Sequence, residues 1–477
     1  MDTIAIDLSE EPSYDSLELF LESIRDEAET RDHSVLLSIS MPSGLLDPLA
    51  VLESIYETNE LHFYVERRSD GVAIAGAECA LSFNPEGADR FKAAQQFIEE
   101  TLENTIAVGD ETLAVFGPHF FCSFGFFPEA PADAAFPAST IFVPHWQVST
   151  IEGGCVAIAN ALVEPQSDVA ALARRIWNAN EKFKSIDYAA AGSDGGRGNS
   201  EPWKVLEESE VVSGLGFKDA VEKALDRISD GELQKLVVAR ALDIRANQVF
   251  HPLEILNTLR ERYPDCFAFS VANGADQSFI GASPERLVQV KAGRLKTEAL
   301  AGSAPRGSSA GEDVALGRAL LESEKDRHEQ SLVFESIIRR LNTLGIEIDS
   351  PSEPSLKRLQ NVQHLHSPIE GALPDAVGIF DVLEQLHPTP AVGGTPREKA
   401  CEIIPTLEGF DRGLYAGAIG WVNSQGEGDF LVSIRSALVS GTNARLYAGV
   451  GIVEGSDPEK ERQETDLKFQ ALKENLL

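Results

Sequence analysis

The amino-acid sequence predicts an α+β fold built on antiparallel sheets. Segments rich in β-branched and aromatic residues, the composition of strands, follow one another in adjacent groups along the chain. Segments whose apolar residues recur every three or four positions, as in amphipathic helices, form groups of their own. A parallel sheet needs a long crossover between successive strands, so this grouping favours antiparallel pairing over a repeated βαβ pattern. The apolar content of 43% is ample for a large core in 477 residues.

The first part of the chain mixes strands with amphipathic helices. Leu17, Phe20 and Ile24 share one helical face, which predicts the first helix. Further helices are expected at residues 90–106 and 168–183. The strands of this part are expected at residues 34–40, 61–68, 72–83, 112–127 and 140–150.

A stretch of small and polar residues, AAAGSDGGRGNSEP at 189–202, interrupts this pattern. Clusters of Gly, Ser, Asp and Pro are typical of loops and linkers. We therefore divide the chain into an N-terminal α/β portion of the fold, residues 1–200, and a second portion, residues 201–477. The same stretch can also be a loop inside one single structural domain.

The second portion again contains both kinds of segment. Its helices are expected at residues 217–228, 252–263, 312–344, 376–386 and 397–408, with a last helix from about residue 458. Its strands are expected at residues 234–244, 267–273, 278–290 and 294–300, followed by three glycine-flanked strands within 414–452.

The strong negative charge argues against two classes of partner. At a formal net charge of -35 and an isoelectric point near 4.6, the chain lacks the basic surface that nucleic acid requires and is repelled by anionic membranes. An anionic substrate would need a local positive site or a metal ion inside this negative field. The N-terminus, MDTIAIDLSEEPS, is acidic where a signal peptide is basic, and no apolar run is long enough to cross a membrane. We therefore expect a cytoplasmic protein.

The cysteines give no sign of a disulfide framework or a zinc site. Cys79, Cys122, Cys155, Cys266 and Cys401 are an odd number without paired spacing. Buried free thiols in a reducing cytosol are the expectation.

Two carboxylates continue the apolar face of one predicted helix. Asp326, Glu329, Val333, Ile337 and Leu341 follow one another at spacings of three or four, hence on one stripe. A buried carboxylate must become neutral or meet a cation, because an unpaired buried charge is costly. The alternative is that this first turn projects into solvent, near the favourable N-terminus of the helix.

The terminal helix shows a similar arrangement. Glu464, Lys468, Leu472 and Leu476 lie along one stripe, and Glu461 is one turn before Glu464. A solvated Glu–Lys pair is one interpretation. Two helices that present carboxylate oxygens to a common interior would instead suit Mg²⁺, which binds few carboxylates and keeps several waters.

A lysine interrupts the apolar face of a predicted strand. Lys235, Val237 and Ala239 share one face, since side chains alternate along a strand. A lysine buried there would lose its proton more readily and could serve as a general base. The alternative is a lysine on an edge strand, where it would block aggregation.

Three other features would complete a site for an anionic substrate. Glu285 follows a Gly-Ala-Ser-Pro turn beside a strand, where a protected acid could donate a proton, although a loop carboxylate is usually only surface. Arg435, in LVSIRSAL, could bind a carboxylate through two hydrogen bonds from its guanidinium group. The glycines of EALAGSAPRG and LYAGVGIVEG could let backbone N–H groups approach an anion, or could simply make turns. These residues predict a magnesium site with one base and one acid but identify no reaction.

The same residues lie in motifs that resemble a known family. Across roughly 230–470 the chain contains, in order, GASPE, LAGSAPRG, SEKDRHEQ, VQHL, LHPTPAVGG, SIRSAL and YAGVGIVEGSDPEKERQET. Together these resemble the chorismate-utilising enzymes, and within them the isochorismate synthases. The segment AAFPASTIFVPHWQV is similar, more loosely, to menaquinone-type members. Most of the first 200 residues carry no sharp motif.

The resemblance implies a fold and a pair of catalytic residues. The fold is α+β, with two large antiparallel sheets, surrounding helices and the site between them, so that 201–477 is the chorismate-binding catalytic portion. Lys235 would be the base that activates water to attack C2 of chorismate. Glu285 would be the acid that protonates the departing C4 hydroxyl. Such a positioned acid or base contributes about 10²- to 10⁴-fold to a rate.

It also implies a metal site and a substrate site. Glu329 and Glu464 would hold Mg²⁺, which clamps the ring carboxylate, and Asp326 and Glu461 would support the metal and its waters. Tyr415 and Arg435 would bind the enolpyruvyl carboxylate. The remaining pocket residues that it implies are Ser303, His364, Ala391, Gly449, Gly451 and Lys468.

Few positions separate the branches of this family. Ammonia-using members generally lack the lysine that Lys235 matches, and the chain reads Ala-Leu-Ala-Gly-Ser at 299–303 where the aminodeoxychorismate branch has a lysine. No amidotransferase subunit is therefore expected. Salicylate synthases, which go on to eliminate pyruvate, usually have a threonine in place of Ala391, so the hydroxyl-transferring branch is favoured.

Two alternatives differ from isochorismate synthesis. One is salicylate synthesis, and the other is a non-catalytic binding protein of the same fold, which would have lost the base, the acid or the metal carboxylates. None of these residues is missing. The resemblance implies chorismate as the small-molecule substrate and a product for menaquinone, phylloquinone, a catechol siderophore or salicylate made by another enzyme. We expect a monomer as the default oligomeric state.

Overall fold

The structure of the protein is a computed structural model that describes residues 1–4, 13–44, 46–55, 59–113, 115–151, 154–184, 203–212, 214–349 and 353–476. Its α-helices are α1 (Tyr14–Arg31), α2 (Pro48–Ile55), α3 (Arg90–Glu103), α4 (Val169–Lys184), α6 (Phe217–Ser229), α7 (Pro252–Arg262), α8 (Ala310–Glu322), α9 (Glu324–Thr343), α10 (Ile379–Leu386), α11 (Arg397–Glu408) and α12 (Pro458–Leu476). Its strands are β1 (Asp2–Ile4), β2 (Val35–Pro42), β3 (Leu61–Arg67), β4 (Val72–Phe83), β5 (Thr105–Val108), β6 (His119–Phe124), β7 (Ser139–Ile151), β8 (Gly154–Val163), β9 (Val205–Glu210), β10 (Lys235–Ala246), β11 (Phe267–Asn273), β12 (Ser278–Ser283), β13 (Arg286–Lys291), β14 (Arg294–Pro305), β15 (Ser355–Arg358), β16 (Val362–Ala372), β17 (Gly394–Thr395), β18 (Ala418–Asn423), β19 (Gly428–Val432), β20 (Ser436–Ser440) and β21 (Asn443–Ile452).

The predicted α+β class and antiparallel pairing are confirmed. Within the described residues the strands form one network of 21 strands, and only the pairs β1–β5 and β2–β5 are parallel. The two expected sheets are two arms of this network. The first arm runs β9–β10–β21–β20–β12–β11–β3–β4, and the second runs β6–β18–β19–β13–β14–β16–β15.

Strand β7 joins the two arms. It pairs with β4 along most of its length, while its first residues pair with β6 and its last residues pair with β8. Beyond β8 the network continues through β2 to β5 and β1. One long strand therefore belongs to both arms, as at the corners of folded-over sheets.

The chain crosses between the arms at two predicted site residues. Strand β12 belongs to the first arm and β13 to the second, and Pro284 and Glu285 connect them. Proline cannot donate to a sheet ladder, so the single strand expected at 278–290 is interrupted there. Arg435 lies in the reverse crossing, from β19 to β20, with a left-handed φ of 53°. Positive φ is uncommon for a residue with a side chain and marks a tight change of direction.

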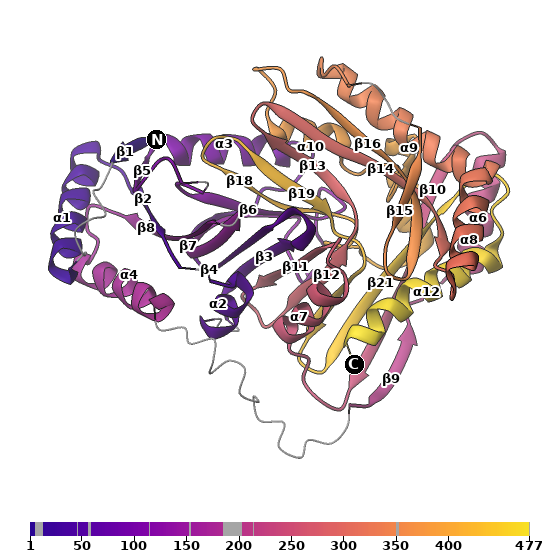
Figure 1. Ribbon diagram of the computed structural model, residues 1–477, viewed down its shortest axis with the longest axis horizontal. Coiled ribbons are helices and arrows are strands. Elements are labelled where there is room, and N and C mark those ends of the chain that lie inside the picture. Colours follow the sequence, from indigo (N-terminus) through magenta and orange to yellow (C-terminus); the bar gives the residue numbers. More distant parts are fainter. Residues whose placement is uncertain are drawn as a thin grey trace.

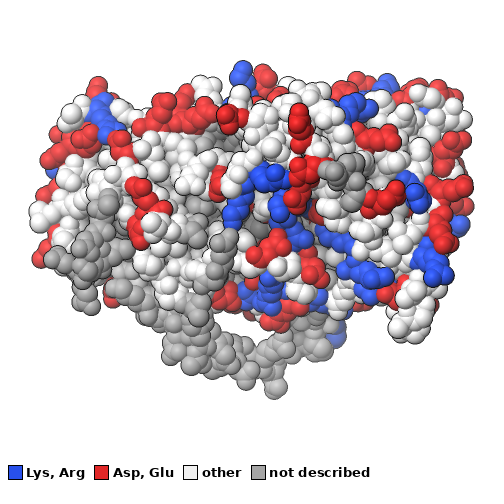
Figure 2. Space-filling model, turned by 45° about the horizontal axis from the view of Figure 1, so that its top comes forward, with Lys and Arg blue, Asp and Glu red and all other residues white. Residues whose placement is uncertain are grey.

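The two arms approach each other where the site lies. Strands β10 and β21 of the first arm and β14 and β16 of the second gather on the right of Figure 1, with α9 and α12 beside them. Helix α9 packs against β14 and helix α12 against β21. The face in Figure 2 has acidic side chains along its upper edge and toward both ends, while basic ones gather nearer its middle.

Other sequence predictions need correction. The helix expected at 312–344 is two helices, because Ser323 has an extended backbone and its side chain caps α9 by accepting a hydrogen bond from the Asp326 amide. The strand expected at 112–127 is only β6, since Gly117 has positive φ and is followed by a proline. The helix expected to reach residue 106 ends at Glu103 and gives way to β5. The segment 414–452 holds four strands, not three.

The two portions expected from the sequence share their sheets. Strand β3 pairs with β11, and β6 pairs with β18. The break at 189–202, on which the division at residue 200 depends, lies outside the described residues. No helix in the described part of the chain is long and apolar enough to cross a membrane.

Candidate active site

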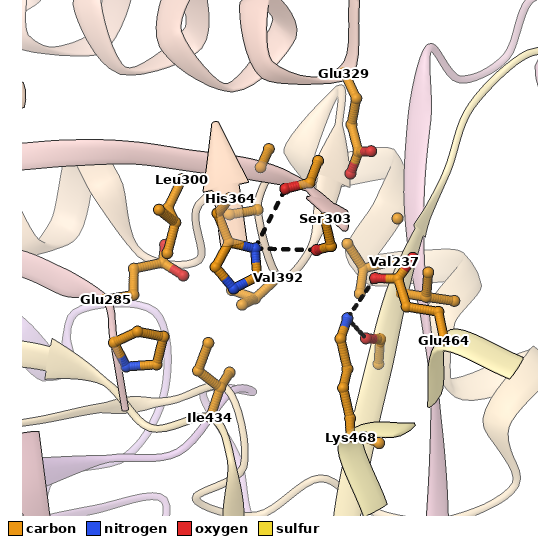
Figure 3. Close-up of a pocket in the computed structure, with 18 of the residues that line it drawn as sticks. Val237, Glu285, Leu300, Ser303, Glu329, His364, Val392, Ile434, Glu464 and Lys468 are labelled. Carbon is orange, nitrogen blue, oxygen red and sulfur yellow. Dashed lines mark hydrogen bonds and ion pairs between the residues drawn. The ribbon is translucent and has the colours of Figure 1, made fainter. Parts of the chain in front are cut away.

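A cavity lies between the two arms and contains most of the predicted site. Its walls come from β10 and β21 on one side and from β14 and β16 on the other, and α9 and α12 contribute side chains (Figure 3). All the predicted site residues line this cavity except Lys235 and Glu461, which lie directly behind lining residues. Residues more than 200 positions apart in the sequence thus form one site.

The first residue of β10 is the buried lysine. Lys235 pairs in the sheet with Thr395 on β17, and its neighbour Leu236 pairs with β21, so the strand is not an edge here. Its side chain is 1% exposed, and its Nζ lies 2.9 Å from Oε1 of Glu329 in an ion pair. The angles are not those of a hydrogen bond, and Nζ has no hydrogen-bond partner among the described residues. The interpretation as an edge-strand lysine is therefore wrong.

A glycine makes room for this ion pair. A Cβ at Gly451 would stand 2.2 Å from Oε1 of Glu329 and 2.8 Å from Cε of Lys235. Both distances are too short for a contact, so a side chain at this point of β21 would push Glu329 and Lys235 from their present positions. The glycine-rich strand is therefore explained by close packing of side chains on its face.

Glu285 has the electrostatics of a proton donor. Its side chain is buried at the crossing between the arms and lines the cavity. Burial and, to a lesser degree, the nearby charge of Glu298 raise the pKa of Glu285 to about 8, against the opposing charges of Lys357 and Lys235. A carboxyl group with this pKa keeps its proton at neutral pH, as a general acid requires.

The predicted apolar stripe of α9 is confirmed. Val333, Ile337 and Leu341 are buried, and Glu329 continues their face into the cavity together with half-buried Asp326. Burial raises the pKa of Asp326, and repulsion from Glu329 and Glu464 adds to the effect. The cavity thus concentrates carboxylates from two helices, and their mutual repulsion would be relieved by a cation.

Lysines form ion pairs with three of the glutamates on α9 and α12. In addition to the pair of Lys235 with Glu329, Lys325 Nζ lies 2.7 Å from Oε1 of Glu461 and Lys468 Nζ lies 2.8 Å from Oε1 of Glu464. Burial raises the pKa of Glu461 although Lys325 opposes it. Burial would also raise the pKa of Glu464, but Lys468 and other donors lower it overall.

No group of three or more His, Cys, Asp or Glu side chains in the described part of the chain is arranged to hold a metal ion. The donor chemistry nevertheless fits Mg²⁺, because the groups that line the cavity from α9 and α12 are carboxylates, the hard oxygen ligands this ion prefers. Asp326, Glu329 and Glu464 would have to turn from their present partners to share one ion.

A hydrogen-bonded chain runs along the cavity from Arg435 through His364 to Ser303. Arg435 Nη2 donates to Nε2 of His364 at 3.2 Å, and His364 Nδ1 lies 3.0 Å from Oγ of Ser303 and 3.2 Å from the carbonyl oxygen of Gly302. Burial lowers the pKa of His364 well below its ordinary value, and Arg435 adds to the effect, so the ring is neutral. Because Nε2 accepts, the proton is on Nδ1 and is donated to Ser303 or Gly302. The nearby Ser303 hydroxyl helps to lower the pKa of Glu464.

Aromatic and aliphatic residues complete the walls. Tyr415 is buried and stacks on Tyr447, with 5.1 Å between ring centroids. Its hydroxyl would stand 2.7 Å from a Cβ at Gly449, so this glycine also makes space. Ala391 lines the cavity beside Val392.

Sequence reasoning missed three supporting groups. Arg412 is fully buried, pairs with Glu408, and donates to the carbonyl oxygens of Val237 and Val392, which both line the cavity. The only sequence signal for Arg412 is the Asp-Arg pair at 411–412, just before Leu-Tyr-Ala-Gly, and two letters do not reveal burial. Glu298 and Lys357 lie beside Glu285, and nothing in the sequence linked them to it.

Comparisons with known proteins agree with the motifs. A family profile described as "Chorismate binding enzyme" matches residues 21–477. The chain is 34% identical over 460 residues to the salicylate biosynthesis isochorismate synthase of Pseudomonas aeruginosa, covering 94% of this chain and 92% of that protein. It is 30% identical over 450 residues to the isochorismate synthase MenF of Bacillus subtilis, covering 92% and 93%. Its fold is similar to that of MenF, the menaquinone-specific isochorismate synthase from Escherichia coli, with a TM-score of 0.75, 27% identity, and coverage of 96% of this chain and 100% of that one. The chain therefore belongs to the family of chorismate-binding enzymes.

Proposed function

We propose that this protein is an isochorismate synthase, an isomerase that adds water at C2 of chorismate and releases the C4 hydroxyl. The observation that carries the proposal is the pairing of a buried acid that keeps its proton at neutral pH, Glu285, with a buried lysine, Lys235, at one cavity. Figure 3 has Glu285 on one side of the cavity and Glu329, the partner of Lys235, on the other. Membership of the family and the isochorismate synthases among the relatives support the same reaction.

The two residues have complementary roles. Lys235 takes a proton from the attacking water, and Glu285 gives its proton to the departing hydroxyl. Addition at one end of an allylic system and departure at the other need a base and an acid on opposite flanks of the ring. Arg435 and Tyr415 bind the enolpyruvyl carboxylate, and the chain from Arg435 through His364 and Ser303 holds that end of the cavity.

The same proposal includes Mg²⁺. Glu329 and Glu464 would hold the ion, with Asp326 and Glu461 supporting it and its waters. When bound, the ion would stabilise negative charge on the ring carboxylate and orient the substrate. Gly449, Gly451, Ala391 and Lys468 would line the rest of the substrate site.

Product analysis tests the proposal. Purified protein is incubated with chorismate and Mg²⁺, and the products are separated by chromatography. Isochorismate as the product supports the proposal. Salicylate with pyruvate would identify a salicylate synthase, dependence on ammonia would reject both, and binding without turnover would indicate a non-catalytic protein of this fold.

The proposal also includes the cellular setting of the protein. We expect a cytoplasmic monomer that uses chorismate directly, without an amidotransferase subunit. Its isochorismate would serve the synthesis of menaquinone, phylloquinone or a catechol siderophore.

A further inference from the structure

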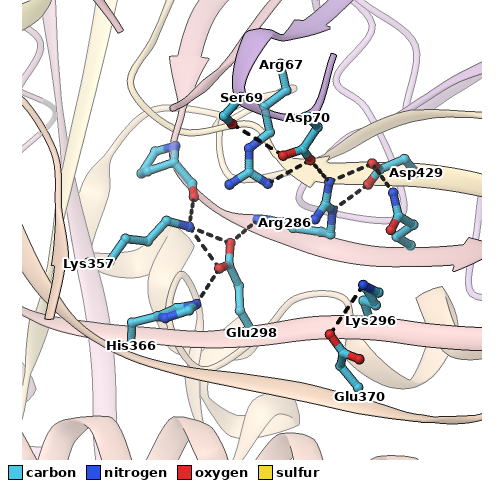
Figure 4. Close-up of polar contacts among 12 residues, drawn as sticks. Arg67, Ser69, Asp70, Arg286, Lys296, Glu298, Lys357, His366, Glu370 and Asp429 are labelled. Atoms are coloured by element: carbon cyan, nitrogen blue, oxygen red, sulfur yellow. Dashed lines mark hydrogen bonds and ion pairs between the residues drawn. The ribbon is translucent and has the colours of Figure 1, made fainter. Parts of the chain in front are cut away.

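The peptide groups on both sides of Glu285 are held by one buried ion pair (Figure 4). On the N-terminal side, Lys357 Nζ donates to the carbonyl oxygen of Pro284 at 2.6 Å. On the C-terminal side, the backbone N–H of Arg286 donates to Oε1 of Glu298 at 2.7 Å. Lys357 Nζ also bonds to both carboxylate oxygens of Glu298, at 2.8 and 2.9 Å. The residues before and after Glu285 are therefore tied to the same pair of side chains.

The ion pair comes from strands of the second arm, and Lys357 is 73 positions from Pro284 in the sequence. Glu298 is on β14 and Lys357 on β15, and His366 on β16 makes a further 2.8 Å contact with Oε2 of Glu298. The side chains of Glu298 and Lys357 are only 8% and 13% exposed. Burial alone would raise the pKa of Glu298, but His366, Lys357 and the Arg286 amide lower it to about 2, so this carboxylate stays charged.

A buried ion pair is a poor way to stabilise a fold, because desolvation offsets most of the attraction. Two groups of this pair, Lys357 Nζ and Glu298 Oε1, form hydrogen bonds with the short connection that carries the acid. A catalytic carboxyl must be held within a fraction of an ångström of its productive position. A clamp on the two flanking peptide groups achieves this without contact with the carboxyl itself.

We infer that Glu298 and Lys357 are positioning residues that fix Glu285 for proton donation. The inference rests on the proposed function, since it assumes that Glu285 is the acid. It adds residues that lie outside the cavity wall and touch no substrate.

The charges around Glu285 predict opposite effects for substitutions of Glu298 and of Lys357. Glu298 disfavours the ionised form of Glu285, whereas Lys357 and Lys235 favour it. His366 faces Glu298 from β16, and His364 and Arg435 line the same cavity from other elements. Removing the charge of Glu298 and removing that of Lys357 should therefore shift the titration of Glu285 in opposite directions.

The experiment compares Lys357→Met with Glu298→Gln. We expect kcat to fall roughly 10- to 100-fold in Lys357→Met with KM changed by about threefold or less, because the acid is misplaced while substrate contacts remain. The alkaline limb of the profile of kcat/KM against pH should move up by about one unit or more in Lys357→Met and down in Glu298→Gln. Lys357→Arg should recover part of kcat.

A matched control is available in the same arm of the sheet. Lys296 on β14 and Glu370 on β16 form an ion pair at 3.4 Å, and their side chains are 49% and 43% exposed. Lys296→Met and Glu370→Gln make the same two substitutions in an exposed pair, and both should keep the kcat and pH profile of the unchanged protein.

A second readout separates failure of the inference from failure of the proposed function. The protonated carboxyl band of Glu285, identified by its loss in Glu285→Gln, can be titrated by infrared spectroscopy without substrate. Opposite shifts of this titration in the two variants support the inference even if chorismate is not converted. Identical profiles in all variants, shifts in one common direction, or effects as large in the exposed control pair would overturn it. If the protein without substitutions makes no isochorismate, only the proposed function is overturned.

Discussion

Lys235 and Glu329 share a buried ion pair in which Nζ and Oε1 are 2.9 Å apart and the side chains are 1% and 11% exposed. The proposed base and a proposed metal ligand are thus each other's partners in this structure. Glu329 has to be compensated either by Lys235 or by a metal ion. This relationship makes the consequences of several substitutions predictable.

Replacement of the base should separate catalysis from folding. Lys235→Ala should lower kcat/KM by about 10²- to 10⁴-fold, the usual contribution of a positioned base. It also leaves Glu329 buried without its lysine, a loss that typically costs about 3–5 kcal/mol. We expect an unchanged circular dichroism spectrum with a lower melting temperature, part of which Mg²⁺ restores. Lys296→Ala, at an exposed lysine, is the control, and full activity in Lys235→Ala would remove the assigned role.

Metal binding should be visible without any turnover. Mg²⁺ should raise the melting temperature of the unchanged protein by ~2 °C or more, because a ligand that binds only the folded state stabilises it. Glu464→Gln should abolish this shift, and EDTA should abolish turnover of the unchanged protein. Glu459→Gln, at an exposed residue of the same helix, should behave like the unchanged protein. A shift that survives in Glu464→Gln would place the ion elsewhere.

The raised pKa of Glu285 predicts how kcat/KM depends on pH. Because the pKa of Glu285 is about 8, kcat/KM should be retained below that pH and fall as the pH rises through it. Glu285→Gln should abolish turnover at every pH. An alkaline limb that stays well above pH 8 would indicate another proton donor.

The same group links pH to stability. Its folded-state pKa is raised from the ordinary 4.5, so its contribution to stability is complete below pH 4.5 and is lost as pH rises through 8. Glu285→Gln has no carboxyl to ionise. Between pH 6 and pH 9 its melting temperature should therefore fall less than that of the unchanged protein. Equal losses in both proteins would mean that Glu285 is ionised in the folded state.

Close packing at Gly451 gives a steric test. In Gly451→Ala the new methyl group would stand 2.2 Å from Oε1 of Glu329 and force the ion pair apart. We expect turnover to fall by roughly 10²-fold or more, since small displacements of catalytic groups have such effects. Gly311→Ala in helix α8 meets no atom within 4 Å and should leave activity unchanged. Near-normal turnover in Gly451→Ala would show that the pair can move freely.

Local periodicity explains what the sequence could predict. The stripe of α9 was visible because Val333, Ile337 and Leu341 repeat with the helical period, and Glu329 extends it by one turn. Alternation along β10 placed Lys235 on an apolar face but left open whether its side chain is buried. Strand β16, in contrast, mixes His, Gln, Ser and Glu with apolar residues because it lines the polar site. Its sequence therefore lacks the clear alternation that predicts a strand.

Long-range register explains what could not be predicted. Glu298 and Lys357 are 59 positions apart and meet only because β14 and β15 both pair with β16. No property of either residue indicates that they flank Glu285. The crossings that bring Glu285 and Arg435 between the arms likewise depend on strand pairings over more than 100 residues.

The most direct test of the proposed chemistry is the origin of the product's C2 oxygen. The protein is incubated with unlabelled chorismate and Mg²⁺ in ¹⁸O-enriched water, and the isochorismate is analysed by mass spectrometry. If Lys235 activates solvent water and Glu285 releases the original hydroxyl, the product carries one ¹⁸O atom at C2. Isochorismate without the label would contradict the proposed attack by water.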